Sequence, residues 1–146
     1  MAHPDLDELV NALFAFAHQM LADHGEFFPF GASMSHDGEI AYSSGLDGEE
    51  DQPDSTRVLE LLLESFAGQA ASGQIRAAGV CMDVTVVPPD GGEPVDAMCA
   101  QLEHEEGEAV DVFLPYHLKP EGGLEYDDLF AGPGDPRVFP GSPLVS

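Results

Sequence analysis

Three consecutive strand-like segments, joined by short connections, constrain the fold of this chain most strongly. Apolar and polar residues alternate over about residues 75–87, 94–104 and 109–117, a pattern typical of strands that lay one face on a core. The two connections, Pro88 to Gly92 and Glu105 to Gly107, have the length of hairpin loops. We therefore expect the three segments to form an antiparallel meander.

Two helices and a hairpin are expected before the meander. Residues 4–24 place apolar side chains at spacings of three and four, with Gly25 suited to end the helix. Residues 55–72 predict a second helix, so apolar across its middle turn that we expect it to be covered on two sides. Between the helices, Asp37-Gly38 separates two short strand-like segments and predicts a type I′ hairpin turn.

The order of these elements predicts an α+β fold, α-β-β-α-β-β-β. Short connections favour one five-stranded antiparallel sheet with both helices packed on one face. We assign residues 1–117 to a single α+β domain and residues 118–146 to a Gly/Pro-rich C-terminal tail packed on it. The tail is expected to be irregular, with at most a short turn of helix.

The alternation also predicts a register and a position for both cysteines. The apolar residues of the three meander strands are mostly even-numbered, so the even side should face the helices. A loop centred on Asp90 then makes Cys81 and Cys99 direct cross-strand neighbours on the other face, and we interpret them as two buried structural thiols. That other face is half-apolar, so either a second subunit or the tail should cover it.

The charge of the chain restricts its partners. With 28 Asp and Glu against 4 Lys and Arg, the formal net charge is −24, so no basic surface exists to bind nucleic acid or an anionic membrane. The acidity fits either a solvated surface, including that of a protein adapted to high salt, or docking to a basic partner. No secretory signal or membrane-spanning stretch is recognisable, and the expected location is the cytoplasm.

No motif for catalysis or for a cofactor stands out, so we predict neither catalytic residues nor a cofactor. His24 and His36 flank the first strand and are the candidate metal ligands, with Glu26 or Glu39 near. The acidic loop at 45–54 lacks the ligand spacing of a calcium-binding loop, and weak cation binding is all that we expect of it.

The segment from Phe30 to Ala41, FGASMSHDGEIA, resembles the first hairpin of the roadblock family within the profilin-like group. The resemblance implies a non-enzymatic dimer that pairs through its second helix and a sheet edge and serves as a scaffold for small GTPases. The Gly/Pro-rich tail stands where that family has a closing helix. Residues 24–31 and 102–116 are also similar to bacterial proteins of no assigned function.

The function predicted from these observations is that of a non-catalytic, homodimeric interaction or regulatory module, with a basic protein as a further partner. The expected interface residues come from the second helix and the outer sheet face: Val58, Leu62, Phe66, Cys81, Cys99 and Phe113. The alternatives are a small-molecule or metal-binding protein, such as a hydrolase, and an acidic immunity-type inhibitor of a basic partner.

Overall fold

The computed structural model describes residues 4–25, 27, 29–43, 55–89, 91–120, 123–134 and 138. These residues form two helices and seven strands, which confirms the α+β class. The bounds are α1 Pro4–His24, β1 Phe30–Ser35, β2 Ile40–Ser43, α2 Ser55–Ala71, β3 Ile75–Val86, β4 Val95–His104, β5 Ala109–Leu118, β6 Leu124–Tyr126 and β7 Phe130–Pro133. Both helices and β3, β4 and β5 agree with the predicted ranges to within one residue, and β1 and β2 lie on either side of Asp37-Gly38 as expected.

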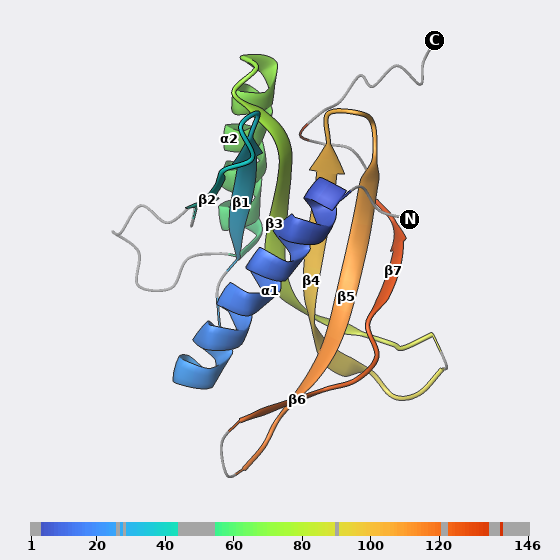
Figure 1. The fold of residues 1–146 in the computed structure, drawn as a ribbon. Coiled ribbons are helices and arrows are strands. Elements are labelled where there is room, and N and C mark those ends of the chain that lie inside the picture. The colour runs from blue at the N-terminus through green and yellow to red at the C-terminus, as the bar shows by residue number, and fades with distance from the viewer. Residues whose placement is uncertain are drawn as a thin grey trace.

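All the strand pairs are antiparallel, and the sheet runs in the order β2-β1-β3-β4-β5-β6, with β7 also paired to β5 (Figure 1). The prediction of five strands is too small, because β6 and β7 share the outer edge of β5. Tyr116 of β5 lies opposite Tyr126 of β6, and Phe113 lies opposite Phe130 of β7. The expectation of an irregular tail with a helical turn is therefore wrong for residues 124–133. The unpaired N–H and C=O groups of a sheet edge explain why the returning chain adds strands there.

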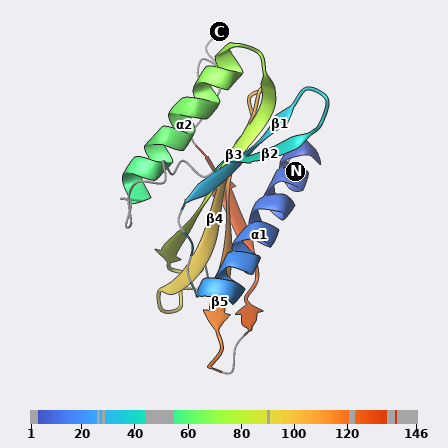
Figure 2. The ribbon, with the colours of Figure 1, turned by 90° about the vertical axis from the view of Figure 1, so that its left-hand side faces the viewer.

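The two helices lie on opposite faces of the sheet, not on one face as predicted. Figure 2 shows the sheet between α1 and α2. α1 packs its apolar stripe against one face, in a cluster that includes Leu13, Ala77 and Ala100. α2 packs against the other face of β1 and β3, in a separate cluster that includes Phe66 and Val80. The fold is therefore three layers, helix on sheet on helix.

The first half of β3, Ile75–Cys81, explains the two-sided packing. Six of its seven residues are buried, because this part of the strand is apolar on both faces. We call Ile75–Cys81, together with the residues of the neighbouring strands that lie beside it, the two-sided half. Glycines let both helices approach closely: a Cβ on Gly31 would lie 2.6 Å from the ring of Phe66, and a Cβ on Gly79 would lie 3.0 Å from the side chain of Leu13. The alternation that predicted one covered face holds only beyond residue 81, where burial falls to an intermediate–exposed pattern.

The two tight turns, between β1 and β2 and between β4 and β5, share one geometry. In the first, the amide of Gly38 donates to the carbonyl of Ser35 at 2.9 Å, and the amide of Ser35 donates to Glu39 at 2.9 Å. In the second, the amide of Gly107 donates to the carbonyl of His104 at 3.0 Å. Among the described residues only glycines have positive φ, so the hairpin at Asp37-Gly38 is present but its turn is not type I′. Each turn combines a type I turn with a left-handed glycine that forms a bulge.

The register between β3 and β4 differs by one residue from the predicted one. Cys81 lies opposite Ala100, and Cys99 lies opposite Met82. Successive side chains point to opposite faces of a strand, so Cys81 faces α1, whereas Cys99 faces the α2 side. Both cysteines are free and buried, as expected. The prediction that they are direct cross-strand neighbours is wrong. The even-numbered residues of β3 accordingly share a face with the odd-numbered residues of β4 and β5.

One residue of the C-terminal segment, Val138, contacts the α2 side of the sheet. The amide of Val138 donates to a carboxylate oxygen of Glu103 at 2.8 Å, and the side chain of Val138 packs in the cluster with Val58 and Leu62. The predicted odd-numbered face does not exist as one surface, because Cys81 and Cys99 lie on opposite sides of the sheet. On the α2 side, α2 and Val138 cover the sheet together. In the part of the chain that the structure describes, neither helix is long and apolar enough to cross a membrane.

Candidate functional site

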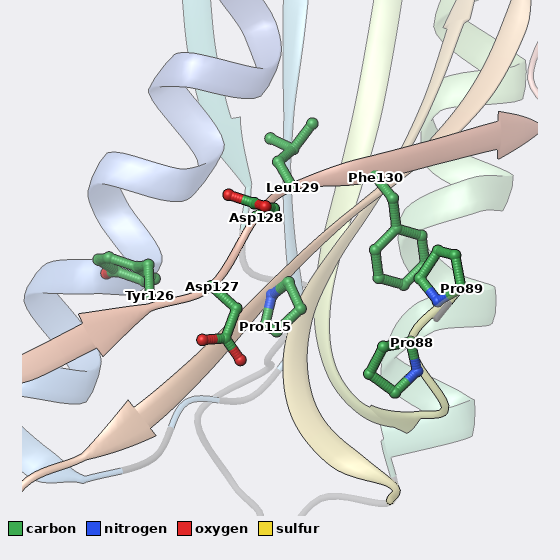
Figure 3. Close-up of a pocket in the computed structure, with 8 residues that line it drawn as sticks. All are labelled: Pro88, Pro89, Pro115, Tyr126, Asp127, Asp128, Leu129 and Phe130. Carbon is green, nitrogen blue, oxygen red and sulfur yellow. The ribbon is translucent and has the colours of Figure 1, made fainter. Parts of the chain in front are cut away.

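A surface groove of about 660 Å³ lies by the loop that follows β3, at the end of that strand opposite to its connection with α2 (Figure 3). We call it the distal groove. It lies between the segment that joins β6 to β7 and the loop that joins β3 to β4. Its lining is apolar on one side and acidic on the other: Pro88, Pro89, Pro115, Leu129 and Phe130 form the apolar part, and Tyr126, Asp127 and Asp128 the polar part.

The apolar part of the groove is built from rings. Phe130 stacks on Phe113 with ring centroids 5.1 Å apart and an interplanar angle of 17°, so the Phe130 ring is held in place. Figure 3 shows Phe130 beside Pro89, with Pro88 and Pro115 nearby. Stacked aromatic rings and proline rings have few conformations to lose on binding, and they form a surface suited to aliphatic stems or flat groups.

The acidic part consists of two adjacent, exposed carboxylates. Asp127 pairs with the ring of His117 at 2.8 Å, and its amide donates to the carbonyl of Pro115 at 3.0 Å. The side chain of Asp128 is exposed, and Figure 3 shows it directed differently from that of Asp127. Exposed carboxylates beside an apolar surface attract a cation that carries an apolar stem.

The segment that carries these aspartates is anchored at both ends. Tyr126 of β6 hydrogen-bonds through its hydroxyl to Nδ1 of His18 on α1. Burial raises the pKa of Tyr126. At the other end, β7 pairs with β5 from Phe130 onward. The groove therefore has a fixed frame, although its lining residues come from three separate parts of the chain.

A second hollow, of about 570 Å³, lies by the beginning of α1 and the beginning of β5. Its lining is largely apolar and includes Val10, Val110 and Pro133, with Asp7 and Glu108 as acidic residues. Leu129 lines both hollows and is 52% exposed. This exposed leucine thus joins them along the outer edge of the sheet.

A partly buried ion cluster lies at the opposite end of the sheet. The Asp5 carboxylate lies 2.8 Å from Nε2 of His104 and 3.0 Å from Nε of Arg76. The amide of Glu106 donates to Nδ1 of His104 at 3.1 Å, so Nε2 carries the proton that His104 donates to Asp5. Arg76 also donates to the carbonyl of His36 at 2.8 Å. The cluster ties the beginning of α1 to two turns, and we assign it a structural role.

The structure does not bring the two candidate metal ligands together. His24 is the last residue of α1, whereas the backbone of His36 is held by Arg76, which binds Asp5 at the beginning of α1. A 21-residue helix is roughly 30 Å long, and its length separates the two histidines. Glu26 and the loop 45–54 lie outside the described residues. Within those residues, no three side chains of His, Cys, Asp or Glu are grouped as a metal site.

The predicted interface residues lie mostly inside the chain's own core. Val58, Leu62 and Phe66 are at most 3% exposed and form the face of α2 that contacts the sheet. Phe113 is half-buried against Phe130. The strong apolar character of α2 is thus used within the monomer.

The cysteines are likewise unavailable to a partner or a reaction. Burial is the main cause that raises the pKa of Cys99 to about 12, and it raises the pKa of Cys81 well above its ordinary value. Neither thiol is therefore present as a reactive thiolate near neutral pH.

On the α1 side of the sheet, a tyrosine and an aspartate form a separate pair. The Tyr116 hydroxyl donates to a carboxylate oxygen of Asp83 at 2.8 Å. Burial, followed by this bond to Asp83, raises the pKa of Tyr116. Burial also raises the pKa of Asp83, against the lowering effect of the Tyr116 bond. This bond links β3 to β5 across β4.

Sequence reasoning missed the distal groove. Its residues are spread over positions 88–130 and match no motif, and the segment that carries Asp127 and Asp128 falls in the predicted tail. One signal was available: the run Tyr126-Asp127-Asp128-Leu129-Phe130 contains three large aromatic or aliphatic side chains, which favour contact with the body of the protein.

Comparisons with known proteins give no relative from which a function could be transferred. No protein-family model matches the sequence, and neither a curated protein nor a solved structure matches it. The resemblance to the roadblock family stays a prediction, and any function must be argued from the geometry above.

Proposed function

We propose that this protein is a non-catalytic interaction module that docks a basic segment of another protein in the distal groove. The observation that carries the proposal is the composition of the groove: proline and phenylalanine rings on one side and the carboxylates of Asp127 and Asp128 on the other. A lysine or arginine side chain matches both parts, because its stem is apolar and its end is cationic.

The charge of the whole protein supports the same kind of partner. A net charge of −24 attracts a basic chain over a longer range than two carboxylates can, and it accelerates encounter at low ionic strength. Three exposed hydrophobic residues lie on or directly beside the groove-lining segments, namely Val87, Tyr126 and Leu129. The preferred segment therefore combines basic with apolar residues.

Fluorescence anisotropy with a short labelled peptide of alternating arginine and leucine tests the proposal. We expect saturable binding that weakens when NaCl rises from about 0.05 M to about 0.5 M, because salt screens exposed charges. The double variant Asp127→Asn with Asp128→Asn should weaken binding at least about tenfold, equivalent to about 1.4 kcal/mol.

A matched control separates the groove from the general acidity of the protein. Glu60 and Glu64 are exposed on α2, and Glu60→Gln with Glu64→Gln makes the same change in net charge away from the groove. Equal loss of affinity in both double variants would show that the peptide responds to net charge alone, and the proposal would fail. A small-molecule site would instead show binding of an alkylguanidine as tight as that of the peptide.

A further inference from the structure

Among the described strands, β2 forms the edge of the sheet opposite β6 and β7. β2 pairs with β1 on one side, and no described strand pairs with its other side. The amide of Ser35 bonds to the carbonyl of Glu39, so these two residues form a hydrogen-bonded pair. Alternation along the ladder turns the backbone groups of Ala41 toward β1 and those of Ile40 and Tyr42 away from it.

Within Ile40–Ser43, this edge lacks two of the features that usually protect a free strand, charge and proline. Edge strands are commonly blocked by charged residues, proline or a bulge, and Ile40-Ala41-Tyr42-Ser43 contains no charged residue and no proline. Tyr42 is 49% exposed and Phe16 of α1 is 40% exposed. Their ring centroids lie 5.2 Å apart, so an aromatic pair borders the open edge.

The charge distribution indicates which partner fits this edge. The stretch Leu9–Ala22 of α1 and the strand Ile40–Ser43 contain no Asp or Glu, although the chain has 28 such residues. A basic partner would gain little from an uncharged surface. Two copies that each carry −24 repel each other least across a surface with few carboxylates. Glu39, the exposed carboxylate next to Ile40, lies at the end of this surface.

We infer that a second copy of this chain pairs with the free edge of β2 and forms a continuous antiparallel sheet across a two-fold axis. With Ala41 on the axis, Ile40 of each copy lies opposite Tyr42 of the other, and their outward N–H and C=O groups form hydrogen-bonded pairs. The small side chain of Ala41 suits the close spacing of the central, non-hydrogen-bonded pair. The axis is perpendicular to the sheet, so both copies of α1 lie on one face and the two Phe16–Tyr42 pairs adjoin.

This interface is distinct from the distal groove, and the two respond oppositely to salt. Salt screens the repulsion between two acidic copies, so raising NaCl from about 0.05 M to about 0.5 M should strengthen the dimer. The same change should weaken the binding of a basic peptide. Size-exclusion chromatography with light scattering, run over a range of protein concentrations in both buffers, measures the dimer dissociation constant.

Three substitutions locate the interface. Tyr42→Glu adds a carboxylate at the edge and should raise the dissociation constant at least about tenfold. Tyr42→Pro removes an outward N–H group without affecting the hydrogen bonds to β1, and should do the same. Leu61→Glu is the control, because Leu61 is an exposed residue of α2 (37%) and the change in charge is identical; it should leave the dimer intact.

A protein that remains monomeric at all concentrations and in both buffers would overturn the inference. A dimer that neither Tyr42 variant weakens would also overturn it, since its interface must then lie elsewhere. Circular dichroism establishes that each variant is folded, and if the proline variant is not, Tyr42→Glu against Leu61→Glu still decides. Peptide binding by Tyr42→Glu should equal that of the wild type, so failure of one proposal is distinguishable from failure of the other.

Discussion

The two ends of the β3–β4 hairpin are built on different principles. In the two-sided half, Ile75–Cys81, both faces of the strand are covered and nearly every residue is buried. In the distal half, Met82–Val86, every second residue is exposed, and the hairpin continues into the loop that lines the distal groove. One pair of strands therefore serves as the centre of the core at one end and as the frame of a binding surface at the other.

The difference between the two ends indicates at which residues a substitution destabilises the fold and at which it does not. Residues packed between two helices and a sheet have no room to relax, and the loss of one leaves a cavity. Residues at the distal groove contact solvent, so their substitution alters binding more than folding. Three predictions, ordered from the largest expected change in the free energy of unfolding to the smallest, test this division.

Phe66→Ala should destabilise the protein by about 3–5 kcal/mol, the usual cost of removing a fully buried aromatic side chain. Phe66 is 0% exposed, and its ring lies directly over Gly31. Urea unfolding followed by circular dichroism measures the change. The control, Leu61→Ala on the exposed side of α2, should cost about 0.5 kcal/mol or less, and equal costs for the two variants would contradict the packing described for α2.

Cys99, at the boundary between the two halves, should make the protein sensitive to alkali. Burial raises the pKa of Cys99 from 9.0 to about 12, so as the pH rises through 9 the unfolded chain loses this proton while the folded chain keeps it. Because the folded state holds this proton more tightly than the unfolded state, the free energy of unfolding falls as the pH rises. For this thiol the loss is about 1.4 kcal/mol at about pH 10.

Urea midpoints at about pH 8 and about pH 10 measure this effect. Cys99→Ala should remove its share of the pH dependence, whereas Cys81→Ala should remove a separate share that comes from the α1 side. A Cys99→Ala variant with the same alkaline loss as the wild type would show that the thiol is not buried as described.

Asp127→Asn with Asp128→Asn should change the free energy of unfolding by about 0.5 kcal/mol or less, because both side chains are exposed. The same variant is expected to lose most of its peptide affinity, and this contrast between stability and binding is the sharpest form of the comparison. Urea unfolding of the double variant measures the first quantity. A loss of stability comparable to that of Phe66→Ala would make the groove a structural element instead of a binding surface.

Local patterns were sufficient to predict both helices and the first five strands. The apolar stripe of α1, the glycine after it, and Asp37-Gly38 act over a few residues, and neighbouring residues decide their outcome. The candidate site was not predictable in this way. Pro88, Pro115 and Phe130 come together only because β3, β5 and β7 share one sheet.

The sequence by itself determined the elements, the antiparallel pairing and the strongly acidic surface, because periodicity, turn residues and charge are properties of short segments and of composition. Only the tertiary structure decided which face each helix covers, the one-residue difference in register that separates Cys81 from Cys99, and the addition of β6 and β7 to the edge of β5. The physical reason is that a strand apolar on both faces, such as Ile75–Cys81, allows either side to be covered. The choice between the two sides then depends on contacts between residues far apart in the chain, such as Phe66 over Gly31 and Leu13 beside Gly79.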